Sequence, residues 1–162
     1  LPEYVIVGRT HPKVLAHEGE AYRDSLKEIA RELGVEAMVT FVDEYLDAAA
    51  LAEYVTSADV VLLPYDNHDQ VTSGVLVEAV AAARPVVATA FPHAVELLTG
   101  GAGLVVDHGN PQAIAAALRT VFSGQGRLMS EVATRVSLGT SWTEIAARYD
   151  AVAATILASR AA

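Results

Sequence analysis

The chain has 162 residues, the length of about one domain. Hydrophobic residues make up 52% of it and charged residues 19%, so it can bury a core and is not a disordered segment. Eleven Lys and Arg against 20 Asp and Glu leave a net charge of −9, which excludes a general nucleic-acid binder and a basic membrane-surface protein.

The chain contains no cysteine, which excludes disulfide scaffolds, cysteine nucleophiles and thiolate zinc sites. No apolar run approaches the roughly 20 residues that a membrane span needs. Both features are compatible with a soluble protein of a reducing cytoplasm, and we expect that location. Peripheral attachment of a longer protein to a membrane is the alternative.

In the first part of the chain, short apolar runs alternate with segments whose apolar residues recur at helical spacing. Glycines and small polar residues at the ends of these segments suit helix caps. The expected elements are a strand at 4–7, a helix at about 22–33 ended by Gly34, a strand at 38–42, a helix capped by Asp47, and a strand at 60–63.

The same alternation continues to about residue 122, after which the pattern is helical only. The expected elements are a polar loop at 66–70, a helix at about 73–83, a strand at 86–88, a short helix at 92–98, a strand at 104–106, a helix started by Asn110 and Pro111, a break at 124–126, and terminal helices within about 127–159.

Five strands that alternate with helices predict an α/β fold with a doubly wound parallel sheet of the Rossmann-like kind. In such sheets, ligands bind at the carboxyl ends of the strands. The loops at residues 8–13, 43–46 and 65–74 are therefore the expected ligand loops.

The helix after the third strand contains an unexpected carboxylate. Residues 75–83 are apolar all round except for Glu78, and an apolar helix is normally a buried one. A buried carboxylate needs a partner or an opening into a cleft. Thr72, Ser73 and Gly74 form a small-residue entrance to this helix, where free N–H groups and the helix dipole suit a phosphate. Glu78 can accept two hydrogen bonds from a vicinal diol such as that of a ribose.

A structural interpretation stays open at this point. Thr72 or Ser73 would then be only an N-cap, and Glu78 would pair with a nearby Arg or Lys. Arg9, which follows the first strand, has the same two interpretations, because it either reaches a phosphate or is an ordinary surface residue.

From Ser73 to Thr89 the sequence resembles the signature of the group 1 (family 4) glycosyltransferases, in which a glutamate precedes Pro-Val-Val by seven residues, as Glu78 precedes Pro85. The resemblance extends over nearly the whole chain. His11-Pro12 and the stretch Gly19–Arg23 resemble mannosyltransferase-like members. Further matching segments are 58–64, 96–98, 103–106, 110–114 and 141–146.

The resemblance implies the C-terminal, donor-binding half of a GT-B glycosyltransferase, with the N-terminal acceptor domain absent from this chain. Glu78 would bind the ribose hydroxyls, and the backbone from Thr72 through Ser73 and Gly74 to Val75 would meet the diphosphate and the sugar. On the other side of the donor, Gly8 and Arg9 would approach a phosphate. Tyr45, in the loop at 43–46, would lie near the base.

Three positions depart from the family pattern. Gln70 stands where a family glutamate contacts the donor sugar, and an amide cannot supply charge to an oxocarbenium-like transition state. The family glycine lies five residues before the glutamate, whereas Ser73 holds that position here and Gly74 follows it. Ala83 replaces the helix-ending glycine, at a cost of about 1–2 kcal/mol if the residue is left-handed.

The family likeness implies transfer of a hexose, with mannose as first choice, from a GDP- or UDP-sugar to a glycan or lipid-linked acceptor. Configuration would be retained without a cofactor or a required metal, and the five histidines show no metal-ligand spacing. We expect this domain to be inactive by itself. The alternatives are half of a nucleotide-sugar epimerase and a non-catalytic nucleotide-binding α/β domain.

Overall fold

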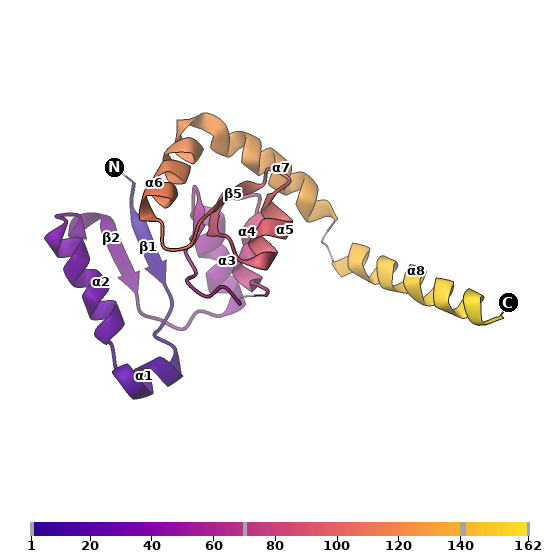
Figure 1. Cartoon of the computed structure of the whole chain (residues 1–162), viewed down its shortest axis with the longest axis horizontal. Helices are drawn as coiled ribbons and strands as arrows, with labels where there is room; N and C mark the ends of the chain where they lie inside the picture. Colours follow the sequence, from indigo (N-terminus) through magenta and orange to yellow (C-terminus); the bar gives the residue numbers. More distant parts are fainter. Residues whose placement is uncertain (1, 70, 140–141, 162) are drawn as a thin grey trace. The chain divides into compact units, whose positions relative to one another are not determined.

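The computed structural model describes residues 2–69, 71–139 and 142–161. Residues up to Leu51 form one compact unit, and those from Ala52 onward form a second. Each unit combines parallel strands with helices, so the α/β class predicted from the sequence is confirmed (Figure 1). The assignment of the whole chain to one domain stays a prediction.

The first unit has a two-stranded parallel sheet of β1 (Tyr4–Val7) and β2 (Val39–Val42), with Tyr4 opposite Val39 and Val7 opposite Val42. Between these strands come α1 (Pro12–Glu18), α2 (Ala21–Glu32) and the short 3-10 helix η1 (Glu36–Met38). The expected stop at Gly34 is confirmed, because this residue is left-handed with φ 66°. Helix α3 (Ala48–Ser57) follows β2.

The second unit contains a three-stranded parallel sheet in the order β3-β4-β5. Its strands are β3 (Val61–Leu63), β4 (Val86–Thr89) and β5 (Gly103–Val106). The helices that follow β3 and β4 are α4 (Gly74–Ala81) and α5 (Pro92–Leu98). After β5 come α6 (Pro111–Thr120), the π-helical turn η2 (Val121–Gln125), α7 (Gly126–Leu138) and α8 (Trp142–Ala161).

The core of the second unit is centred on β4. Val86, Val87 and Ala88 are fully buried, which means that both faces of this strand are covered. Val87 packs with Ala117 of α6, Val121 of η2 and Met129 of α7. Helices α4 and α5 follow the carboxyl ends of β3 and of this buried strand.

Two features differ from the sequence-based expectation. The described strands form two separately hydrogen-bonded parallel sheets rather than one five-stranded sheet. Apolar runs indicate burial, but they carry no information about which strand lies beside which. Helix α1 also lies partly inside the segment 8–13 expected as a loop, since His11 accepts the Lys13 N–H and Pro12 starts the helix.

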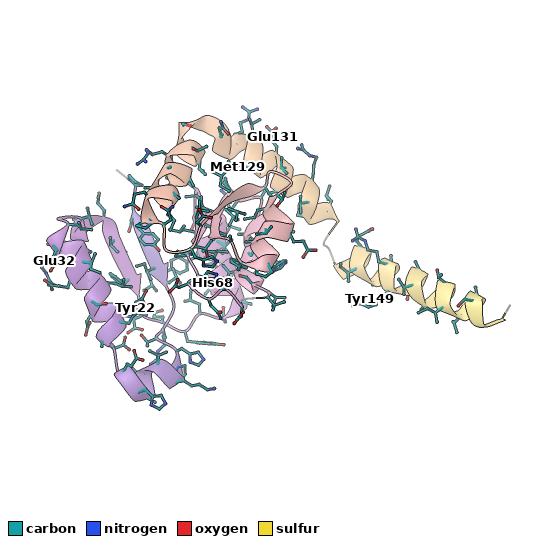
Figure 2. The ribbon with its side chains drawn as sticks, viewed as in Figure 1. Tyr22, Glu32, His68, Met129, Glu131 and Tyr149 are labelled. Carbon is teal, nitrogen blue, oxygen red and sulfur yellow. The ribbon has the colours of Figure 1, made fainter. Side chains whose placement is uncertain are left out.

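Helix α8 has an exposed apolar surface, which includes Tyr149 (labelled in Figure 2), Val152 and Ile156. Within the described ranges, no helix is long and apolar enough to cross a membrane.

Candidate functional site

The N-terminus of α4 is the best-defined polar feature at the carboxyl end of β3. Ser73 is its N-cap, with extended φ/ψ of −137° and 116°. The Ser73 hydroxyl accepts the N–H of Leu76 at 3.2 Å. Although it is polar, Ser73 is only 5% exposed. The local sequence therefore starts the helix as predicted, with a serine whose oxygen replaces a missing backbone acceptor.

Two backbone donors stay open at this helix end. In the described part of the chain, the N–H groups of Gly74 and Val75 have no hydrogen-bond acceptor. Apart from its two chain neighbours and the backbone of its own helix, a Cβ placed on Gly74 would meet no atom of the described residues within 4 Å. These N–H groups and the positive end of the helix dipole offer an uncrowded place for an anion.

Side chains from α5 and from the loop after β3 contact Ser73. His93, the second residue of α5, accepts the Ser73 N–H at Nδ1 over 3.1 Å. The Tyr65 hydroxyl lies 3.2 Å from the Ser73 hydroxyl, within hydrogen-bond distance. The hydroxyl of the buried Thr89 donates to the Tyr65 carbonyl at 2.7 Å. Ser73 is thus contacted from the loop after β3 and from α5, and β4 supports that loop through Thr89.

Sequence reasoning did not select Tyr65, His93 or Thr89. The available signal was position, since Thr89 ends β4 and Tyr65 lies in the loop after β3, at the edge where ligands bind. Nothing in the sequence shows that His93, 20 residues after Ser73, bonds to it. That pairing depends on the parallel alignment of β3 and β4.

Glu78 lies one helical turn after Gly74 and is half-buried. Its Oε2 atom is buried and has no hydrogen-bond partner in the described ranges. Of the two parts of the structural interpretation, the Ser73 cap is therefore confirmed, whereas a pairing of Glu78 with an Arg or Lys is not found among the described side chains. A buried carboxylate oxygen without a partner is costly, and a ligand hydroxyl would satisfy it.

The part that the other predicted residues play in this site stays a prediction, and three of them, Gly8, Arg9 and Tyr45, lie in the first unit. Gly8 ends β1 with φ 122°, a backbone conformation that favours glycine. Arg9 is exposed and forms no ion pair within the described residues. Tyr45 is 85% exposed. Thr72 is exposed at the entrance to α4. Gln70 lies outside the described residues.

Arg23 organises the first unit. This side chain donates to the Gly8 carbonyl at 2.6 Å and lies 3.7 Å from the Asp43 carboxylate, so it links the carboxyl ends of β1 and β2. Glu20 pairs with Arg23 at 3.4 Å and accepts the Thr10 hydroxyl at 2.6 Å. The segment Gly19–Arg23 noted in the sequence therefore has a structural function in this unit.

The histidines take up other contacts. Within the described part, no group of three or more His, Asp or Glu side chains is arranged to hold a metal ion. His68 (labelled in Figure 2) stacks on His108 with ring centroids 4.0 Å apart, which links the loops after β3 and β5. Both ring nitrogens of His108 are buried and lack hydrogen-bond partners in the described ranges.

The second unit has a hollow at the end of its sheet opposite to the α4 N-terminus. It has a volume of about 470 Å³, and Asp59, Arg84 and Arg127 are among its lining residues. Because Asp59 and Arg84 precede β3 and β4, this hollow lies at the amino ends of the strands. Ser73, Gly74 and Glu78 do not line it.

The fold is of the α/β class, and the N-terminus of α4 can accommodate an anion. The neighbouring Glu78 carboxylate can accept hydrogen bonds from hydroxyl groups of a ligand. Residues 3–123 match the model of the family described as "Glycosyl transferases group 1". The chain therefore belongs to the group 1 glycosyltransferases.

One curated relative matches much of the chain. The chain is 36% identical over 136 residues to D-inositol 3-phosphate glycosyltransferase of Kineococcus radiotolerans, a match that covers 76% of this chain and 30% of that protein. The chain thus spans about a third of the curated relative it matches.

Solved structures agree in fold. HepE from Anabaena in complex with UDP has a TM-score of 0.77 at 21% identity, covering 97% of this chain and 41% of that one. The C-terminal domain of the group 1 glycosyltransferase LpcC from Francisella tularensis has a TM-score of 0.70 at 21% identity, covering 88% of this chain and 70% of that one. The fold is that of the Rossmann-like C-terminal domain of GT-B glycosyltransferases.

Proposed function

We propose that this chain binds the nucleotide-diphosphate sugar of a glycosyltransferase that transfers a hexose to a glycan or lipid-linked acceptor. The observation that carries the proposal is the buried Oε2 of Glu78, which has no hydrogen-bond partner among the described residues. It lies one turn after the N–H groups of Gly74 and Val75, which are open in the same part of the chain. A nucleoside diphosphate offers both matching groups, because it carries an anionic diphosphate next to a ribose diol.

Each residue of the α4 N-terminus has a distinct part in this proposal. The N–H groups of Gly74 and Val75 donate to diphosphate oxygens, while Thr72 and Ser73 line the same entrance. Glu78 accepts hydrogen bonds from the ribose hydroxyls. In the first unit, Gly8 and Arg9 approach a phosphate and Tyr45 lies by the base. Gln70 contacts the donor sugar through its amide.

The finer specificity is also a proposal. The structures of HepE contain UDP and UDP-glucose, which favours a uridine donor by family likeness. The His11-Pro12 and Gly19–Arg23 segments favour GDP-mannose through their similarity to mannosyltransferase-like members. Family membership supports the further proposal that configuration is retained and that another domain binds the acceptor, and we expect no turnover by this chain alone. The family match favours a transferase over an epimerase half or a non-catalytic domain.

The test is a thermal-unfolding titration of the chain with UDP, GDP and ADP. A nucleotide at a hundredfold its Kd stabilises the folded state by about 2.7 kcal/mol, which raises Tm by several degrees. We expect one of the three nucleotides to raise Tm in this way. Glu78→Gln keeps the shape of the side chain, and we expect it to raise the Kd of that nucleotide at least fivefold.

Gly74→Ala separates binding from folding. The added methyl group meets open space in the free protein and replaces a poor helix former, so the free energy of unfolding stays the same or rises by about 0.5 kcal/mol. The same methyl group projects beside the proposed diphosphate and should weaken binding. Nucleotide binding that is unchanged in both Glu78→Gln and Gly74→Ala would contradict the proposed site.

A further inference from the structure

His93 has a contact that its sequence position does not suggest. It is the second residue of α5, and its Nδ1 accepts the backbone N–H of Ser73 at 3.1 Å. A ring nitrogen accepts a hydrogen bond only when it carries no proton. In this arrangement Nδ1 is therefore the ring nitrogen without a proton.

This contact determines which donors of the α4 N-terminus remain open. Ser73 uses its N–H on His93, and its hydroxyl takes up the N–H of Leu76. Gly74 and Val75 lie between these two bonds and keep free N–H groups in the described structure. The two bonds hold both sides of the short backbone segment whose N–H groups have no acceptor among the described residues.

The start of α5, which carries His93, is packed in the core. Its neighbours Phe91 and Ala94 are fully buried, so the start of α5 is anchored in the core. The Phe91 ring lies 5.1 Å from the Tyr65 ring, and the Tyr65 hydroxyl lies 3.2 Å from the Ser73 hydroxyl. The start of α5 therefore supports Ser73 twice, through His93 on the backbone and through Tyr65 on the side chain.

We propose that His93 is a positioning residue of the nucleotide site. Its Nδ1 holds the Ser73 backbone so that the N–H groups of Gly74 and Val75 stay directed at the diphosphate. The inference rests on the proposed function, since it concerns the same helix end. It adds to the site a residue of α5 that acts through Ser73 and is not proposed to contact the nucleotide.

The experiment compares three variants of His93 that differ in whether and where residue 93 offers a hydrogen-bond acceptor to the Ser73 N–H. His93→Asn places a carbonyl oxygen near the position of Nδ1, whereas His93→Gln moves the same amide one methylene further along the side chain. His93→Ala removes the acceptor altogether. The measurement is the Kd of the nucleotide that binds the unaltered chain, taken at a temperature where every variant is folded, together with the Tm of each variant without nucleotide.

We expect His93→Ala and His93→Gln to weaken nucleotide binding about fivefold, the effect of one lost hydrogen bond. His93→Asn should restore affinity to within about twofold, because the Ser73 N–H regains its acceptor. A role limited to stability predicts a different result, in which Tm falls but Kd at low temperature does not change. Equal affinities for the Asn and Gln variants would overturn the inference.

A second readout does not depend on the nucleotide. Nitrogen-15 spectra of the unaltered chain should identify Nδ1 of His93 as an unprotonated ring nitrogen. A proton on Nδ1 would overturn the inference even if the nucleotide binds. Loss of binding in Glu78→Gln together with equal affinity of all three His93 variants would leave the proposed function intact and reject the positioning role. If the unaltered chain binds none of the nucleotides, both proposals fail.

Discussion

Ala83 shows how a single residue stores strain at the end of α4. Its φ is 55°, and it is the one non-glycine residue with a positive φ in the described ranges. Its N–H bonds to the Val80 carbonyl at 3.0 Å, and the Arg84 N–H bonds to the Ala79 carbonyl at 2.9 Å. These two bonds form a Schellman motif, whose left-handed position favours glycine.

We predict that Ala83→Gly stabilises the chain. Relief of the left-handed alanine gains about 1–2 kcal/mol, and the greater freedom of glycine in the unfolded chain offsets about half of that. The expected net gain is about 0.5–1 kcal/mol in the free energy of unfolding, measured by urea denaturation. Ala81→Gly is the matched control, because Ala81 is exposed in the last helical turn and should lose about 0.5–1 kcal/mol. A loss of stability in both variants would refute this account of Ala83.

At the scale of the element, the N-caps of α4 and α6 form a natural pair. Ser73 accepts the Leu76 N–H at 3.2 Å, and Asn110 accepts the Ala113 N–H at 2.9 Å. Both residues precede their helix by one position and bond three residues ahead. The two caps have the same structural task, but only the first belongs to the proposed nucleotide site.

We predict that Ser73→Ala and Asn110→Ala each lower the free energy of unfolding by about 1 kcal/mol, the usual effect of a lost cap. Nucleotide affinity should separate them. Ser73→Ala should also weaken binding, because the Tyr65 and Leu76 contacts that position the helix end are lost. Asn110→Ala should leave affinity unchanged when measured by calorimetry below the unfolding transition. An equal loss of affinity in both variants would indicate a general effect of reduced stability.

The elements that the sequence predicted share one property, which is that their signal is local. All five strands and the caps Asp47, Ser73 and Asn110 follow from apolar runs and small polar residues at fixed spacing. Helix α1 was not predicted, although α5, which also has seven residues and also begins at a proline, was. The break expected at 124–126 is present at Gly124, which has φ 109° within the π-helical turn.

At the scale of the whole molecule, burial is concentrated around β4, and the described side chains of α8 are exposed or partly so. Leu98 of α5 is 1% exposed, whereas Leu157 of α8 is 67% exposed. The same substitution at these two positions therefore removes the same atoms from very different surroundings.

We predict that Leu98→Ala lowers the free energy of unfolding by about 2–4 kcal/mol, because it leaves a cavity in the core. Leu157→Ala should change it by less than about 0.5 kcal/mol. Urea denaturation of both variants with a common slope gives the comparison. A cost of more than about 1.5 kcal/mol at Leu157 would show that α8 is covered by other parts of the protein.

The sequence by itself determined the α/β class, the positions of the strands and the family, because apolar periodicity, caps and the segment from Ser73 to Thr89 are properties of contiguous residues. It also selected Glu78, since a carboxylate in an apolar helix stands out without any coordinates. The tertiary structure decided what lies beside Glu78 and Ser73. His93 reaches Ser73 through the parallel pairing of β3 with β4. The same pairing brings Thr89 of β4 to the Tyr65 carbonyl, and the strands divide into two sheets. The physical reason is that hydrogen bonds between distant residues depend on strand order and register, which hydrophobic patterns do not encode.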